Sequence, residues 1–340
     1  MKSKKYLYFT IATISFLVSA THVYAGLDEG RAAYEREDFG AAIQEFLPLA
    51  QQGDLDAQAF LGWMYGNGEG VAKDYKQAAA WYTKAAEQGN AIAQTNLGVM
   101  YENGRGVAQD YKRAFAWYAK AAEQGYADAQ ANLGVMYENG HGVAQDYKQA
   151  AAWHSKAAEQ GLADAQYNLG LMHDKGREVA QDYKQAVAWY DKAAQQGHKK
   201  AQFRYGYSYL IGLGVPQDYK QAVFWISKAA EQGHAGAEYN LGVMYENGHG
   251  VAQDYKQAFA WYAKAAEQGY ADAQNNMGVM YGNGRGVVKS TVVAYALFNL
   301  SASVNSSSEN QALANRDIVT KRMSPNRPLN FPLTPPATEL

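Results

Sequence analysis

Histidine has the widest chemical range of the side chains in this sequence, since it can bind a metal or transfer a proton near neutral pH. A helical metal site of the usual kind places a second histidine three or four residues away, and no histidine here is followed by one. His198 and His234 fill equivalent places 36 residues apart, which helix packing separates by about 10 Å. We therefore expect solvated histidines, and neither a metal site nor a cofactor. The histidines are His22, His141, His154, His173, His198, His234 and His249.

Four acidic side chains stand at multiples of 36 residues from one another: Glu102, Glu138, Asp174 and Glu246. Such a row is able to bind cations or a substrate. Stacked carboxylates repel one another when no metal lies between them. We therefore interpret the row as a solvated negative face, with a cation-binding or substrate-binding row as the alternative.

Glycine-rich segments such as Gly104–Gly106 and Gly140–Gly142 resemble phosphate-binding loops. They lack the third glycine, the Lys-Ser/Thr pair and the preceding strand that nucleotide-binding loops require, so we interpret them as turns. The sequence has no Gly-x-Ser-x-Gly or His-Glu-x-x-His motif and no cysteine. We assign no catalytic residue.

The elements that position these residues come from a repeat of 36 residues, whose first glycine opens repeats 1 to 7 and whose second follows nine residues later. A self-similarity of this length is typical of solenoids. The first glycines are Gly53, Gly89, Gly125, Gly161, Gly197, Gly233 and Gly269. The second glycines are Gly62, Gly98, Gly134, Gly170, Gly206, Gly242 and Gly278. A tryptophan keeps the same spacing from Trp81 to Trp261, and Leu297 takes its place in repeat 7.

Each repeat predicts two helices. In repeat 3 the apolar positions predict one helix over residues 127–138, which Gly140 ends. Asp146 predicts the N-cap of a second helix, with Gln149 three residues later as in a capping box. The small Gly134 and Ala150 allow the two helices to approach closely.

The motifs Ala-x-x-x-Leu-Gly-x-x-Tyr, Gly-x-Gly-Val, Asp-Tyr-x-x-Ala and Trp-Tyr-x-x-Ala-Ala resemble the Sel1-like repeat, a relative of the tetratricopeptide repeat. The resemblance covers residues 53–304 and implies an all-α, right-handed α/α solenoid of helix-turn-helix repeats that acts by binding proteins. Residues 26–52 resemble a capping tetratricopeptide-like hairpin. We expect a capping helix over residues 305–323 and a flexible proline-rich tail over 324–340.

The N-terminus predicts a signal peptide over residues 1–25, with lysines before an apolar stretch and cleavage after Ala25. An uncleaved anchor helix is the alternative. We expect a periplasmic or secreted protein with no stable membrane anchor after cleavage. Removing the segment takes away three lysines and no acid, so the formal net charge falls from −2 to −5. That balance argues against a nucleic acid as partner.

One face of the first helix of each repeat varies along the chain, at the residues six, ten and thirteen positions after the first glycine. The resemblance places this face in the concave groove. In repeats 4 to 6 it gathers aromatic and apolar side chains with an arginine, which is typical of a binding hot spot. Packing of these aromatic groups against each other is the alternative. The candidate partner-binding residues are Tyr167, Leu171, Phe203, Arg204, Tyr207, Leu210 and Tyr239.

Three functions remain open at this stage. The first is a scaffold or inhibitor in the bacterial envelope that binds another protein in the groove, such as a periplasmic enzyme or a delivered effector. The second is an envelope hydrolase or a binder of cell-wall glycan, and the third is a secreted virulence factor that docks a host protein. A repeat specifies a surface rather than a ligand, so the sequence separates these poorly.

Overall fold

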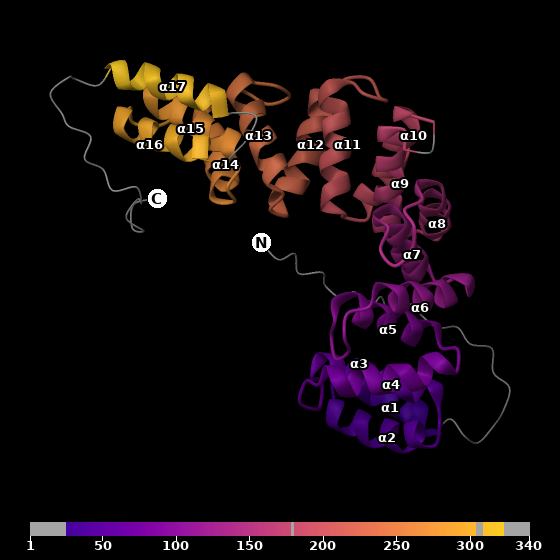
Figure 1. The fold of residues 1–340 in the computed structure, drawn as a ribbon. Helices are drawn as coiled ribbons and strands as arrows, with labels where there is room; N and C mark the ends of the chain where they lie inside the picture. Colours follow the sequence, from indigo (N-terminus) through magenta and orange to yellow (C-terminus); the bar gives the residue numbers. More distant parts are fainter. Residues whose placement is uncertain (1–24, 178–179, 304–308, 323–340) are drawn as a thin grey trace. The chain divides into compact units, whose positions relative to one another are not determined.

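The computed structural model describes residues 25–177, 180–303 and 309–322, and these fold into 17 helices without a strand (Figure 1). The first two form a hairpin, the next fourteen form two per repeat, and α17 packs along α16 and α15. The helices are α1 Ala25–Glu35, α2 Phe39–Gln51, α3 Leu55–Asn67, α4 Tyr75–Glu87, α5 Ala91–Asn103, α6 Tyr111–Glu123, α7 Ala127–Asn139, α8 Tyr147–Glu159, α9 Ala163–Lys175, α10 Tyr183–Gln195, α11 Lys199–Ile211, α12 Tyr219–Glu231, α13 Ala235–Asn247, α14 Tyr255–Glu267, α15 Ala271–Asn283, α16 Thr291–Ser303 and α17 Glu309–Arg322.

The chain divides into two compact units, and the boundary runs through α7. The first unit holds the chain up to Ala129 together with His141–Val143, and the second holds Gln130–Gly140 and the chain from Ala144 onward. Within each unit, successive helix pairs pack in tandem. The prediction of an all-α solenoid of helix-turn-helix repeats is confirmed.

Local sequence signals set the helix ends. Asp146 accepts a hydrogen bond from the backbone N–H of Gln149 at 2.9 Å, so its prediction as an N-cap is confirmed. Gly104 ends α5 in the left-handed conformation with φ of 66°, and its N–H donates to the carbonyl of Met100. The glycine-rich segments are therefore helix-ending turns, as predicted.

A contact between a glycine and a bulky side chain holds the two helices of every repeat together. The second glycine of the first helix faces a large residue of the second helix, and an added Cβ would lie 2.6–2.8 Å from that side chain. Only glycine accommodates this approach. The pairs are Gly62–Tyr82, Gly98–Tyr118, Gly134–His154, Gly170–Tyr190, Gly206–Ile226, Gly242–Tyr262 and Gly278–Phe298.

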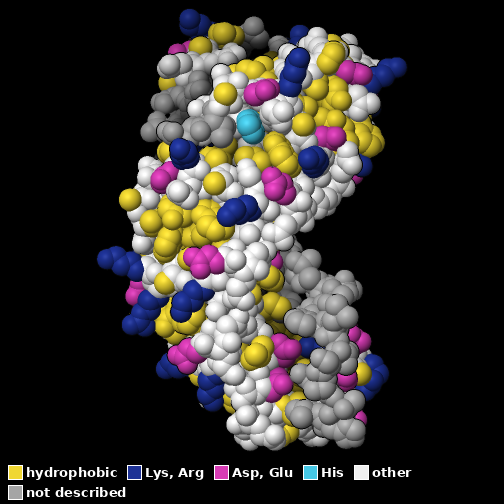
Figure 2. Space-filling view, turned by 90° about the vertical axis from the view of Figure 1, so that its right-hand side faces the viewer, with side chains coloured by type: hydrophobic (Ala, Val, Ile, Leu, Met, Phe, Trp, Pro, Cys, Tyr) yellow, Lys and Arg dark blue, Asp and Glu magenta, His cyan; other side chains and the backbone are white. Residues whose placement is uncertain are grey.

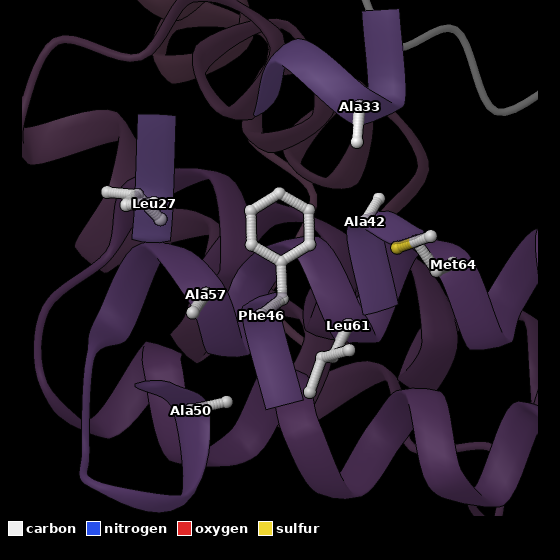
Figure 3. Close-up of a cluster of buried hydrophobic side chains, with 8 residues drawn as sticks. All are labelled: Leu27, Ala33, Ala42, Phe46, Ala50, Ala57, Leu61 and Met64. Atoms are coloured by element: carbon white, nitrogen blue, oxygen red, sulfur yellow. The ribbon is translucent and has the colours of Figure 1, made fainter. Parts of the chain in front are cut away.

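The N-terminal hairpin uses the same contact with a shorter loop. Phe46 of α2 is fully buried, and its ring lies against Gly30 of α1 where a Cβ would overlap it. Figure 3 shows the Phe46 ring within a cluster that also holds Leu27 of α1 and Leu61 of α3. The hairpin therefore shares its core with repeat 1.

Adjacent repeats are joined by tryptophans and by buried glutamines. Trp225 of repeat 5 packs against a buried cluster that contains Ala193 and Ala194 of repeat 4 and Ala201 of repeat 5. Gln202, 4% exposed, donates to the carbonyl of Ala194 at 3.2 Å, and its own side-chain oxygen accepts from Gln232 at 2.7 Å. We call this recurrent arrangement the glutamine ladder. The bond to the alanine carbonyl crosses from one repeat to the next, whereas each side-chain pair lies within one repeat. The side-chain pairs are Gln88–Gln58, Gln124–Gln94, Gln160–Gln130, Gln196–Gln166, Gln232–Gln202 and Gln268–Glu238.

In every repeat except repeat 4, a further glycine lies two residues after the helix-ending glycine and allows the loop to lie on the preceding helix pair. Gly214, with φ of 76°, lies against the carbonyl of Tyr183, where a Cβ would overlap the backbone. Repeat 4 has Glu178 at this position, and the loss of the glycine predicts a local bend of the solenoid. Glu178 lies outside the described residues.

Several predictions concern segments that the structure does not describe. These are the signal peptide before Ala25, residues 304–308 and the tail beyond Arg322. In the described part of the chain, where helices are 11 to 14 residues long, no helix is long and apolar enough to span a bilayer.

Two substitutions in helix α3 test the contact between glycine and the facing side chain. Gly62→Ala in α3 should lower the free energy of unfolding by about 1–3 kcal/mol, because its Cβ would lie 2.6 Å from the Tyr82 ring. Gly66→Ala in the same helix, where the nearest atom is 3.7 Å away, should raise it by up to about 1 kcal/mol through helix propensity. Urea unfolding followed by circular dichroism measures both. Equal effects of the two substitutions would contradict the account.

Candidate functional site

Three aromatic side chains occupy the variable face of α9, α11 and α13. They are Tyr167, Phe203 and Tyr239, and each is half-buried. Each ring lies beside the ring that precedes the first helix of the next repeat. The centroid distances are 4.8 Å for Tyr167–His198, 4.6 Å for Phe203–His234 and 5.0 Å for Tyr239–Tyr270. We call these three pairs the aromatic row.

The histidines of the aromatic row also cap helices. Nδ1 of His198 accepts from the N–H of Ala201 at 3.0 Å, and Nδ1 of His234 accepts from Ala237 at 3.2 Å. Nε2 of His198 lies 2.9 Å from Oδ1 of Asp164. Both histidines therefore have fixed ring orientations, and their prediction as solvated side chains is wrong.

The other described histidines also pack. His141 and His249 of the loops stack on Tyr111 and Tyr219 of the preceding repeats. His154 is fully buried against Gly134, and burial lowers its pKa to about 4. Across residues 25–177, 180–303 and 309–322, no three His, Asp or Glu side chains gather as metal ligands would.

The acidic row serves the packing of helix pairs. The buried hydroxyl of Tyr118 donates to Glu102 at 2.9 Å, and that of Tyr262 donates to Glu246 at 2.8 Å. Tyr190 donates to Asp174 at 3.3 Å in the same way. The prediction of a solvated negative face is therefore wrong for these three carboxylates, since each accepts a hydrogen bond from the ring that packs on the glycine.

Glu138 differs from these three carboxylates because its repeat carries His154 at the position of Tyr118, Tyr190 and Tyr262. Its Oε1 lies 3.5 Å from Nη1 of Arg177. Arg177 in turn lies over the Tyr147 ring, 5.4 Å from its centroid. Glu138 is thus an anchor for the next repeat's loop.

The candidate residue Leu210 belongs to the same packing arrangement. Repeat 5 has Ile226 in place of the tyrosine and Leu210 in place of the acid. Leu210 packs against the cluster that contains Ile226. The apolar character of Leu210 therefore follows from its partner within the repeat.

The other candidates surround the aromatic row. Tyr207 lies beside Phe203, with ring centroids 5.9 Å apart. Burial raises the pKa of Tyr167, and the positive charge of Arg204 opposes the rise. Leu171 is half-buried on α9, one turn after Tyr167.

Sequence reasoning missed the rings that precede the first helices in the row: His198 and His234, which cap α11 and α13, and Tyr270, whose side chain makes no cap bond. The signal was the position after the first glycine, which holds Asp54 and Asn90 in repeats 1 and 2 and rings in repeats 5 to 7. The spacing of the two histidines in the sequence bears only on a metal site. Their stacking on the aromatic row could be predicted only from the distance between one first helix and the start of the next.

Figure 2 shows one face on which hydrophobic side chains gather in separate patches with charged side chains of both signs between them. Among the residues that the structure describes, the most exposed aromatic side chain outside the row is Phe224 of α12, 49% exposed. It packs edge-on against Trp225, with centroids 5.0 Å apart. The other repeats carry alanine at this position.

Glu238 is the acid whose environment most resembles that of a catalytic carboxyl, since it is 4% exposed and burial raises its pKa. Its Oε2 accepts from Gln268 at 2.7 Å. This is the ladder position that holds glutamine in the other repeats. Glu238 is thus a member of the glutamine ladder with a carboxyl in place of an amide.

The family model described as Sel1 repeat matches seven consecutive segments, at residues 55–90, 91–126, 127–162, 163–198, 199–234, 235–270 and 271–306. No protein with a curated description matches the chain in sequence.

Two solved structures are similar over most of the chain. One is a protective antigen of uropathogenic Escherichia coli strains that displays an SLR fold, with 33% identity and a TM-score of 0.60, over 88% of this chain and 72% of that one. The other is a Sel1 repeat protein from Oxalobacter formigenes, with 34% identity and a TM-score of 0.65, over 71% of this chain and 96% of that one.

The buried carboxyl predicts a pH-dependent effect. A raised pKa means that Glu238 contributes most to stability below the ordinary pKa of glutamate, and that the contribution is lost as the pH rises through the pKa of the folded state. Glu238→Gln should therefore be nearly neutral at low pH and stabilise by about 1–2 kcal/mol at neutral pH. Urea unfolding across this pH range measures the difference.

Gln202→Glu is the matched control, since it places a carboxyl at the same ladder position of repeat 5. It should destabilise at neutral pH and have little effect at low pH. If neither variant changes the pH dependence of unfolding, the ladder account of Glu238 fails.

Proposed function

Because the chain belongs to the Sel1 repeat family, whose helical scaffolds are typical of protein–protein interaction, we propose that it binds another protein rather than catalysing a reaction. The proposed surface is the aromatic row together with Leu171, Arg204 and Tyr207. A periplasmic enzyme or an effector delivered by another cell is the class of partner that we propose.

The single observation that carries the proposal is the aromatic row itself. Most repeats have alanine, threonine or asparagine at the position of Tyr167, Phe203 and Tyr239, and the fold contact between glycine and ring is made without them. Rings held on rigid helices lose little entropy on binding and are common anchors of interfaces. Since the caps His198 and His234 hold their neighbours in place, the row is organised before a partner arrives.

The carboxylates that most resemble catalytic groups already accept hydrogen bonds within the fold. Glu102 and Glu246 accept from buried tyrosines, and Glu238 accepts from Gln268. This distribution favours binding over hydrolysis of a cell-wall substrate.

We also propose that the protein acts outside the cytoplasm, in the periplasm or beyond. The support is the predicted signal peptide over residues 1–25. The similarity to a protein described as a protective antigen is compatible with that location.

The test is capture of a partner from envelope extract by the tagged chain. Phe203→Ala with Tyr207→Val returns two positions to residues that other repeats carry, such as Ala131 and Val135, so the variant should fold. We expect it to weaken capture by at least about thirtyfold, as loss of about 2 kcal/mol at a hot spot would.

Phe224→Ala is the control, because it removes an exposed aromatic side chain of the same repeat that lies outside the row. It should leave capture unchanged. Equal capture by the wild type and the double variant would show that the partner binds elsewhere.

A further inference from the structure

Helix α11 differs in charge from the first helices of the other repeats. It carries Lys199, Lys200 and Arg204 and no acidic residue. At the corresponding places α9 carries Ala163, Asp164 and Asn168. The other repeats have no lysine or arginine at these places. Among the first helices of the repeats, positive charge is thus concentrated on α11.

The three cations lie around the Phe203–His234 pair of the aromatic row. Lys199 and Lys200 are exposed, and Arg204 is half-buried. Burial lowers the pKa of His234, and the positive charges of the three cations lower it further. The positive charge of Arg204 also opposes the rise that burial causes in the pKa of Tyr167 on α9. The cations and the rings therefore form one continuous surface.

This arrangement has no evident benefit for folding. In the part of the chain that the structure describes, no carboxylate forms an ion pair with Lys199, Lys200 or Arg204. The hydrogen bond with His198 lowers the pKa of the Asp164 carboxyl, and the positive charge of Lys200 lowers it further. The Asp164 carboxylate is thus already paired with His198. Like charges that are close together repel, and cations at the start of a helix oppose the helix dipole. A ligand of opposite charge would remove this cost.

Resting on the proposed function, we infer that the partner presents an acidic segment, whose carboxylates pair with Lys199, Lys200 and Arg204 while an apolar or aromatic side chain packs on Phe203 and Tyr207. Charge complementarity selects a polyanion. The basic surface is confined to one helix, since the equivalent helices α9 and α13 carry Asp164, Asp174 and Glu246. This favours a polypeptide over a nucleic acid, because binding a nucleic acid backbone uses a long basic stripe.

The probe that tests this inference is a fluorescently labelled random copolymer of glutamate and tyrosine, titrated with the full-length chain. A copolymer of lysine and tyrosine and a single-stranded oligonucleotide are the comparison probes. We expect the acidic copolymer to bind best, and its binding to weaken when NaCl is raised from about 50 to about 500 mM.

The decisive variant is Lys199→Ala/Lys200→Asp/Arg204→Asn, which gives repeat 5 the residues that repeat 4 carries and should therefore fold. Its affinity for the acidic copolymer should fall by at least about tenfold. The control is Lys184→Ala/Lys220→Glu/Lys256→Ala, which changes the net charge by the same amount at exposed positions outside the row. The control should lose less than about twofold.

Equal binding of the acidic copolymer by both variants, or no binding by the wild type, would overturn the inference. Tighter binding of the oligonucleotide that is lost in the decisive variant would overturn it too, because the surface would then recognise phosphate. If the decisive variant still captures a partner that Phe203→Ala/Tyr207→Val loses, the proposed function stands and the acidic partner is excluded.

Discussion

The contact between a glycine of the first helix and a bulky side chain of the second, a ring in every repeat except repeat 5, is the constraint on which the structure depends. It recurs in all seven repeats and, as Gly30 against Phe46, in the N-terminal hairpin. Because a Cβ would lie within 2.8 Å of the facing side chain in each repeat, the distance between paired helices is nearly fixed. The outward residues of the first helices are thereby held at defined spacings, so a row of side chains becomes a rigid surface.

The same contact explains which residues vary together. Where the second helix presents Tyr118 or Tyr262, the first supplies a carboxylate for the hydroxyl. Where it presents Ile226, the first supplies Leu210. Repeat 5 is therefore apolar at this place for a packing reason. Phe203 packs on the same cluster and on His234 while remaining half-buried, whereas Lys199, Lys200 and Arg204 form no ion pair among the described residues. That difference separates packing residues from candidate recognition residues within a single repeat.

Much of the fold was predictable because the repeat is written in short-range signals. Asp146 and Gly140 mark helix ends through interactions within a few residues, and the period of 36 residues places every element. The partners across helices were not predictable in this way. His154 looks like a surface residue in the sequence, yet it is 0% exposed because it occupies the ring position facing Gly134.

The candidate site was predicted only in part, for the same reason. The helical period identified the face that holds Tyr167, Phe203 and Tyr239, but period alone does not tell that Leu210 packs inward. Nor does the period predict that His234 of the next repeat stacks on Phe203, with ring centroids 4.6 Å apart. These two residues are 31 positions apart in the sequence. Tertiary distances decide both points.

Site-specific photo-crosslinking in the cell tests the central claim most directly. The chain would carry p-benzoylphenylalanine in place of Phe203, or in place of Phe224 on the exposed side of α12. The account predicts a covalent adduct with one envelope protein from position 203 and none from position 224. An adduct from position 224 alone, or none from position 203, would contradict it.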